Sequence, residues 1–151
     1  MKMKHLSFIY LFLMVISFTI SIAIFFAWNY PKKFCLNIEN ANNKGMYFNV
    51  DYCSITPKKI SIVGWAFVKS NGRGSRTYLF LQNKKTDGKI EIPLRTFVRK
   101  DVTAKYNLSY DRVGFSAALN FLTHVDDYDN VVTIIIKDQN NNIFEKTYVC
   151  R

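Results

Sequence analysis

The fold is decided by residues 60–69, which read ISIVGWAFVK. Successive side chains of a β-strand point to opposite faces of the sheet, so the stretch separates into two sets. One face carries Ile60, Ile62, Gly64, Ala66 and Val68, and the other carries Val63, Trp65 and Phe67. Both sets are apolar, which predicts a central strand that is covered on both faces.

Six more stretches alternate with the same two-residue period and also read as strands: 47–53, 77–83, 89–98, 113–120, 131–138 and 143–150. Turn residues separate them, and residues 86–88 and 139–142 predict hairpins. Only residues 101–106 look helical, with Asp101 as the expected N-cap. We therefore expect an all-β domain, an antiparallel β-sandwich with immunoglobulin-like topology as the first choice and a small barrel as the second.

The place of two strands within their sheets can also be predicted. Residues 131–136 are apolar on both faces, so this strand is expected to be central. Residues 89–98 instead alternate apolar and polar side chains and contain Pro93. Because proline cannot donate a hydrogen bond to a neighbouring strand, residues 89–98 are predicted to form an edge strand.

Outward from the β-rich region, residues 6–28 form an uncharged run of 23 residues, of which 19 are hydrophobic. A membrane-spanning helix needs about 20 such residues, and the few hydroxyls can bond to the helix's own carbonyls. Lys2 and Lys4 before the run favour an inner-membrane orientation with the N-terminus inside. This predicts a cytoplasmic segment 1–5, an uncleaved anchor 6–28, a juxtamembrane linker 29–46 and an exported domain 47–151. A signal peptide cleaved after Ala23 is the alternative.

The chain has three cysteines, at positions 35, 53 and 150. In an oxidising compartment two of them should pair and one should remain. We expect Cys53–Cys150, which would tie the first strand of the domain to the last. Cys35–Cys53 and three unpaired thiols remain open as alternatives. No cysteine or histidine spacing typical of a zinc site occurs, so no metal site is predicted.

Three short segments carry a resemblance to a known kind of domain: Gly64–Phe67 (GWAF), residues 99–102 (RKDV) and residues 114–117 (GFSA). With the isoleucine-rich strand that ends at Asp138, they resemble a β-sandwich domain of unknown function that recurs in bacterial envelope proteins. The resemblance covers about half of the chain. It implies a β-sandwich fold and an envelope location, and it assigns no catalytic residue.

The positive charge is concentrated in the middle of the domain. The whole chain carries a net charge of +10. Residues 69–105 alone hold ten Lys and Arg against three Asp and Glu. A basic patch is predicted from Arg73, Arg76, Lys84, Lys85, Arg95, Arg99, Lys100 and Lys105. Such a patch attracts anions, and an exported domain would meet an anionic glycan, a membrane surface or another envelope protein rather than nucleic acid. Tyr106 and Tyr110 are the expected surface aromatics for stacking on sugar rings.

The sequence favours a binding or scaffolding module over an enzyme. His124 lies near Asp126 and Asp127, but no nucleophile motif accompanies it, and no phosphate-binding loop occurs. No catalytic residue and no cofactor are therefore predicted. The hypothesis is a single-pass envelope protein, with a small hydrolase or enzyme accessory subunit, or an inhibitor or immunity-type protein, as alternatives.

Overall fold

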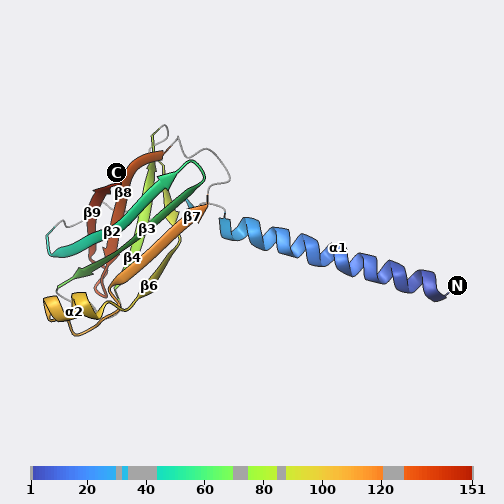
Figure 1. The fold of residues 1–151 in the computed structure, drawn as a ribbon, viewed down its shortest axis with the longest axis horizontal. Helices are drawn as coiled ribbons and strands as arrows, with labels where there is room; N and C mark the ends of the chain where they lie inside the picture. Colours follow the sequence, from blue (N-terminus) through green and yellow to red (C-terminus); the bar gives the residue numbers. More distant parts are fainter. Residues whose placement is uncertain are drawn as a thin grey trace. The chain divides into compact units, whose positions relative to one another are not determined.

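A computed structural model describes residues 2–29, 32–33, 44–69, 75–84, 88–120 and 128–150 (Figure 1). The chain divides into two compact units, Met1–Tyr30 and Pro31–Arg151. The first is the single helix α1 (Lys2–Asn29) and the second is built of β-strands with one short helix. The two units are described one at a time.

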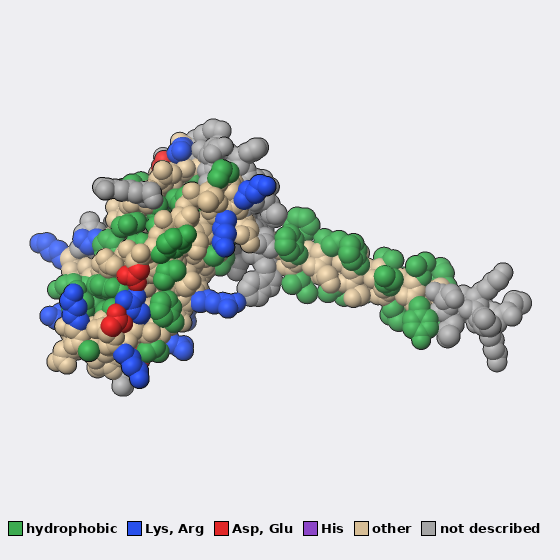
Figure 2. Space-filling view, viewed as in Figure 1, with side chains coloured by type: hydrophobic (Ala, Val, Ile, Leu, Met, Phe, Trp, Pro, Cys, Tyr) green, Lys and Arg blue, Asp and Glu red, His purple; other side chains and the backbone are tan. Residues whose placement is uncertain are grey.

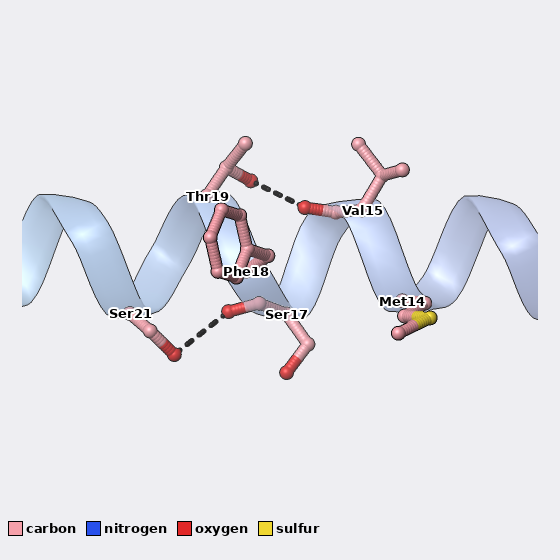
Figure 3. A pocket seen from close by; sticks show the side chains of 6 residues that line it. All are labelled: Met14, Val15, Ser17, Phe18, Thr19 and Ser21. Carbon is pink, nitrogen blue, oxygen red and sulfur yellow. Dashed lines mark hydrogen bonds between the residues drawn. The ribbon is translucent and has the colours of Figure 1, made fainter.

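Helix α1 is long and apolar enough to cross a membrane. Its segment Phe8–Ala27 has a mean hydropathy of 2.5, and none of that segment is buried against the rest of the chain. The Thr19 hydroxyl donates to the Val15 carbonyl at 3.1 Å, and the Ser21 hydroxyl donates to the Ser17 carbonyl at 2.9 Å (Figure 3). The Thr19 hydroxyl also donates to the Ile16 carbonyl at 2.8 Å. These bonds confirm that helix carbonyls accept the hydroxyl protons, which makes both polar side chains compatible with an apolar surrounding.

The second unit consists of two antiparallel sheets (Figure 1). Sheet A has the order β1-β5-β4-β8-β9, from β1 (Lys32–Lys33), β5 (Lys89–Ile92), β4 (Arg76–Asn83), β8 (Tyr128–Lys137) and β9 (Ile143–Val149). Sheet B has the order β2-β3-β7-β6, from β2 (Met46–Thr56), β3 (Lys59–Val68), β7 (Gly114–Asn120) and β6 (Leu94–Phe97). A small barrel would need one closed sheet, whereas the described strands form two.

The main core lies between the inner faces of the two sheets. Strand β3 contributes Ile60, Ile62 and Val68, and strand β8 contributes Ile134 and Ile136, all buried in one cluster. Both strands have hydrogen-bonded neighbours on either side, which confirms the prediction that they are central. The two sheets therefore bury the apolar sets that the two-residue alternation indicated.

A second, smaller core covers the outer face of sheet B. The buried residues Phe67, Val102 and Val113 form it, and Val102 comes from helix α2 (Lys100–Tyr106). Helix α2 is too short to be stable alone, so packing against sheet B holds it in place. This cluster explains why β3 is apolar on both faces: one face meets sheet A and the other meets α2 and its flanking loops.

Two local predictions are wrong. The expected single strand 89–98 is divided at Pro93: β5 belongs to sheet A and β6 is the edge of sheet B. Proline interrupts strand pairing, and here the chain changes sheets at that point. The expected cap, Asp101, lies inside the first turn of α2, and the N-cap is Arg99, which makes no side-chain capping bond. The predicted linker 29–46 is mostly outside the described residues, but within it β1 pairs with β5.

Cys53 and Cys150 lie at disulfide distance, with their Cα atoms 5.5 Å apart. Cys53 is in β2 of sheet B, and Cys150 directly follows β9 of sheet A. The pair confirms the expected partners and links the first strand of sheet B to the last strand of sheet A. Cys35 lies outside the described residues.

Candidate functional site

The structure divides the predicted basic patch between the two sheets. Arg76 begins β4 and Lys84 follows its end, both in sheet A. Arg95 lies in β6 of sheet B, and Arg99, Lys100 and Lys105 belong to helix α2 and its N-cap. Arg73, Lys85 and His124, with Asp126 and Asp127, lie outside the described residues. The described cations that lie near one another in the chain are therefore those of β6 and α2.

Arg99 is engaged with two carboxylates. Its guanidinium donates to Asp101 through two nitrogens at 2.9 and 2.7 Å and to Asp51 at 2.5 Å. Asp101 lies two residues further along the chain, whereas Asp51 lies 48 positions earlier, on β2. Arg99 thus links the α2 end of β6 to the opposite edge strand of sheet B. We call these three residues the Arg99 bridge, and we treat Arg99 as a structural residue instead of a cation open to ligands.

Two backbone features place the Arg99 bridge. The register of β2 shifts between Val50 and Tyr52, and the extra residue at this irregularity is Asp51. On β7, a Cβ atom added to Gly114 would lie 2.8 Å from Cγ of Arg99 and 2.7 Å from the Phe97 ring. Glycine at this position therefore lets the Arg99 side chain run across β7 toward β2.

The bridge changes the protonation behaviour of its members. Hydrogen bonding to Arg99 lowers the pKa of Asp101 from 3.8 to about 2. Hydrogen bonding to Asp101 and then to Asp51 raises the pKa of Arg99 above its ordinary value. All three side chains keep some solvent exposure, with side-chain exposed fractions of 21% for Arg99, 36% for Asp51 and 64% for Asp101. The Arg99 bridge is therefore exposed to solvent and keeps its charges at neutral pH, which suits it to holding strands in register rather than to proton transfer.

Beside the bridge, four aromatic side chains form one contact cluster on the outer face of sheet B. We call it the aromatic platform: Tyr47 of β2, Trp65 and Phe67 of β3, and Tyr106 of α2. Phe67 is buried at the centre and stacks on Tyr47, with ring centroids 5.2 Å apart and planes 12° apart. Tyr106 meets the other three rings at 5.1 to 5.8 Å.

The platform is open to solvent on one side. Tyr47 is 40% exposed, and Trp65 and Tyr106 are each half-buried. Figure 2 shows hydrophobic side chains over the visible face of the β unit, with acidic and basic side chains next to one another between them near α2. The rings are therefore fixed by mutual contacts and still present part of their surface.

The two tyrosines predicted as surface aromatics differ in role. Tyr106 belongs to the platform, and the ammonium group of Lys105 lies 5.6 Å from its ring centroid. Tyr110 packs against the second core and its hydroxyl donates to the Val68 carbonyl at 3.3 Å. Burial raises the pKa of Tyr110 to about 12. Tyr106 is thus the better placed of the two to meet a ligand.

Sequence reasoning missed Tyr47 and Asp51 as site residues. Alternation predicted the strand that carries both, and Tyr47 could have been found from its outward position. Asp51 could not, because a β-bulge changes which side chains face outward. Trp65 had been assigned to the core, and it is instead shared between the second core and the platform.

Two other regions offer less. The hollow lined by Met14, Val15, Ser17, Phe18, Thr19 and Ser21 is formed by α1 alone, so it is the surface of one helix and not a cavity (Figure 3). Within the described ranges, no group of three or more His, Cys, Asp or Glu side chains is arranged to hold a metal ion.

Comparison with known proteins adds no assignment. No protein-family model, no curated protein and no solved structure matches the chain.

Proposed function

We propose that this chain is a single-pass envelope protein of the inner membrane, with its N-terminus inside and its β domain outside. The domain acts as a binding or scaffolding module, and its partner is an anionic glycan or another envelope protein rather than nucleic acid. Helix α1 supports the tether because Phe8–Ala27 has the length and hydropathy of a membrane span. The Cys53–Cys150 pair supports an oxidising compartment.

We further propose that the domain is a β-sandwich of immunoglobulin-like topology. In immunoglobulin lettering, which runs in chain order, β2 is strand A, β9 is strand G and β5 is strand C′. Sheet B then has the strand order A-B-E-D, and β5, β4, β8 and β9 of sheet A have the order C′-C-F-G. That arrangement supports the immunoglobulin order, in which ABED faces CFG. Two features depart from antibody domains: Trp65 is on the second strand instead of the third, and the cysteine pair joins the first strand to the end of the last.

One observation carries the proposed binding role: an aromatic platform that is held rigid by ring contacts and is also partly exposed. Trp65 and Tyr106 also pack against the second core, so the platform is the part of that cluster that reaches solvent. Tyr47, with 40% of its surface exposed, and Tyr106, next to Lys105, give the platform both apolar and cationic character. Such a surface is suited to recognition and lacks the ordered acid–base pair that hydrolysis requires.

The topology is tested with the full chain carrying a C-terminal tag. Membranes are separated and extracted with alkaline carbonate, and intact spheroplasts are treated with external protease. We expect the protein in the extracted membrane pellet, an unprocessed mass of 17.6 kDa plus the tag, and loss of the tag on protease treatment. A tag that is protected until the spheroplasts are lysed would place the domain inside and contradict the proposal.

A further inference from the structure

We infer that the aromatic platform is a binding site for an acidic sugar, a pyranose ring bearing a carboxylate, which stacks on Tyr47 and Tyr106 and places its charge on Lys105. This inference rests on the proposed function and deepens it, because it names the ligand class and the residues that recognise it. It is argued from the geometry of the rings, the position of the charge and the size of the exposed surface.

The rings have the geometry that a sugar requires. One face of a pyranose presents C–H bonds, which pack on the electron-rich face of an aromatic ring. Tyr47 and Tyr106 have centroids 5.8 Å apart and planes inclined by 49°, so together they form a shallow angle above the buried Phe67. Trp65 contacts Tyr106 at 5.5 Å and extends the platform along β3. Because every ring touches at least two others, the platform is ordered before a ligand arrives.

The charge lies where an acidic substituent would be. The Lys105 ammonium lies over the Tyr106 ring, 5.6 Å from its centroid, so a sugar that stacks on Tyr47 and reaches Tyr106 would meet this cation at the Tyr106 face. Lys69 directly follows the end of β3, two positions after Phe67, and it is exposed. Asp51 and Asp101 carry two negative charges against the one positive charge of Arg99, so the Arg99 bridge keeps a net charge of −1. Neither Asp51 nor Asp101 is ion-paired to Lys105, and Lys105 is therefore the cation that an anion on the platform would meet.

The exposed area favours a sugar over a protein. Three rings reach solvent and none is more than 40% exposed, so they offer on the order of 200 Å² in total if each aromatic side chain has roughly 200 Å². A stable protein interface buries about 800 Å² on each partner. The exposed surface of the three rings is therefore of the size of one or two sugar units.

The chain contains only two tryptophans, Trp28 and Trp65, which makes a direct binding experiment available. In full-length Trp28→Phe protein in lipid nanodiscs, fluorescence reports on Trp65 alone. We expect trigalacturonic acid to change the intensity and wavelength of this emission with a Kd on the order of 1 mM or lower. Its fully methyl-esterified form, which has the same rings and no charge, should bind about tenfold more weakly.

Matched variants locate the site. Tyr47→Ala should weaken binding of trigalacturonic acid about tenfold, whereas Tyr52→Ala, which removes a more exposed tyrosine from the same strand, should change it less than about twofold. Lys105→Gln should weaken binding about fivefold and remove most of its salt dependence, and Lys100→Gln on the same helix should not. Thermal unfolding of each variant verifies that the domain remains folded.

The inference is overturned by absence of binding up to about 10 mM trigalacturonic acid, by equal binding of acid and ester, or by equal effects of Tyr47→Ala and Tyr52→Ala. A photo-crosslinking amino acid at position 47, used in native membranes, distinguishes failure of the sugar site from failure of the proposed function. A discrete protein adduct would replace the sugar with a protein partner and keep the binding module. A domain that external protease cannot reach would overturn both.

Discussion

At the scale of single residues, Gly64 is the position where the fold leaves the least room. A Cβ atom there would collide with the backbone carbonyl of Asn49 and would lie 2.9 Å from the Phe115 ring. Because a carbonyl in a hydrogen-bonded strand cannot move aside cheaply, we expect Gly64→Ala to lower the free energy of unfolding by about 3 kcal/mol. Urea unfolding of the purified protein measures this difference.

The comparison variant is Gly45→Ala. Gly45 has a φ of 89° but nothing within 4 Å of its Cβ position, so only the backbone conformation is penalised. A loss of about 1 kcal/mol is expected there. If the two variants lose equal stability, close packing at Gly64 is not what the glycine provides.

Asp101 makes stability depend on pH in an acidic window. Its pKa is about 2 in the folded protein against 3.8 ordinarily, so its ionised form stabilises the fold above about pH 4, and this contribution is lost as the pH falls through about 2. Asp101→Asn should therefore unfold at lower urea than wild type at about pH 6, and the gap should narrow toward pH 2. A gap that stays constant over this range would show that Arg99 does not stabilise the ionised carboxylate.

Prediction from sequence reached its limit at this scale. The pairing of Arg99 with Asp101 joins two residues of one turn. The second partner, Asp51, lies 48 positions away and faces Arg99 only because of the β2 irregularity. A one-residue change of register reverses which side chains point outward, and alternation in the sequence does not show where such a change occurs. Arg99 therefore looked like a free cation.

At the scale of elements, the Cys53–Cys150 pair connects the two sheets at β2 and the end of β9. The cysteines are 97 positions apart. In the chain-entropy account, closing so long a loop lowers the entropy of the unfolded chain and raises the free energy of unfolding by about 4 kcal/mol. In a Cys35→Ser background, the Cys53→Ala/Cys150→Ala variant should lose roughly that much stability in urea unfolding.

Reductant provides the control for this pair. It should lower the stability of the Cys35→Ser protein and leave the variant without the pair unchanged. If reductant affects both proteins equally, the stabilisation comes from something other than the Cys53–Cys150 bond.

Element positions followed well from the two-residue period, since seven predicted stretches all contain strands and residues 101–106 are helical. The exception is the stretch 89–98, where Pro93 indicated an interruption of strand pairing but did not indicate that the chain changes sheets there. Pairing partners are set by contacts between distant strands, so a proline that marks an edge and one that marks a change of sheet look alike in the sequence. The two-residue β1 is too short to give any period.

At the scale of the whole molecule, tether and recognition surface have separate sequence origins. In the proposed function, the apolar run in α1 provides membrane affinity without any specific contact, and the outer face of sheet B provides the specific geometry. A weak sugar site on a tethered domain gains from confinement, because glycan chains at the membrane surface present many copies of the ligand. Low affinity for a single sugar is therefore compatible with the proposed scaffolding role.

The tether itself can be tested by placing charge in its centre. Each lysine in the middle of a membrane span costs about 2.5–3.5 kcal/mol, so Ile16→Lys/Ile20→Lys should move the protein from the carbonate-resistant pellet to the soluble fraction. Thr19→Ala lies between them and should leave the protein in the pellet, since the Thr19 hydroxyl is already bound to the carbonyls of Val15 and Ile16. If the doubly charged protein stays in the carbonate-resistant pellet, the apolar run of α1 is not what holds the protein in the membrane, and the proposed tether is wrong.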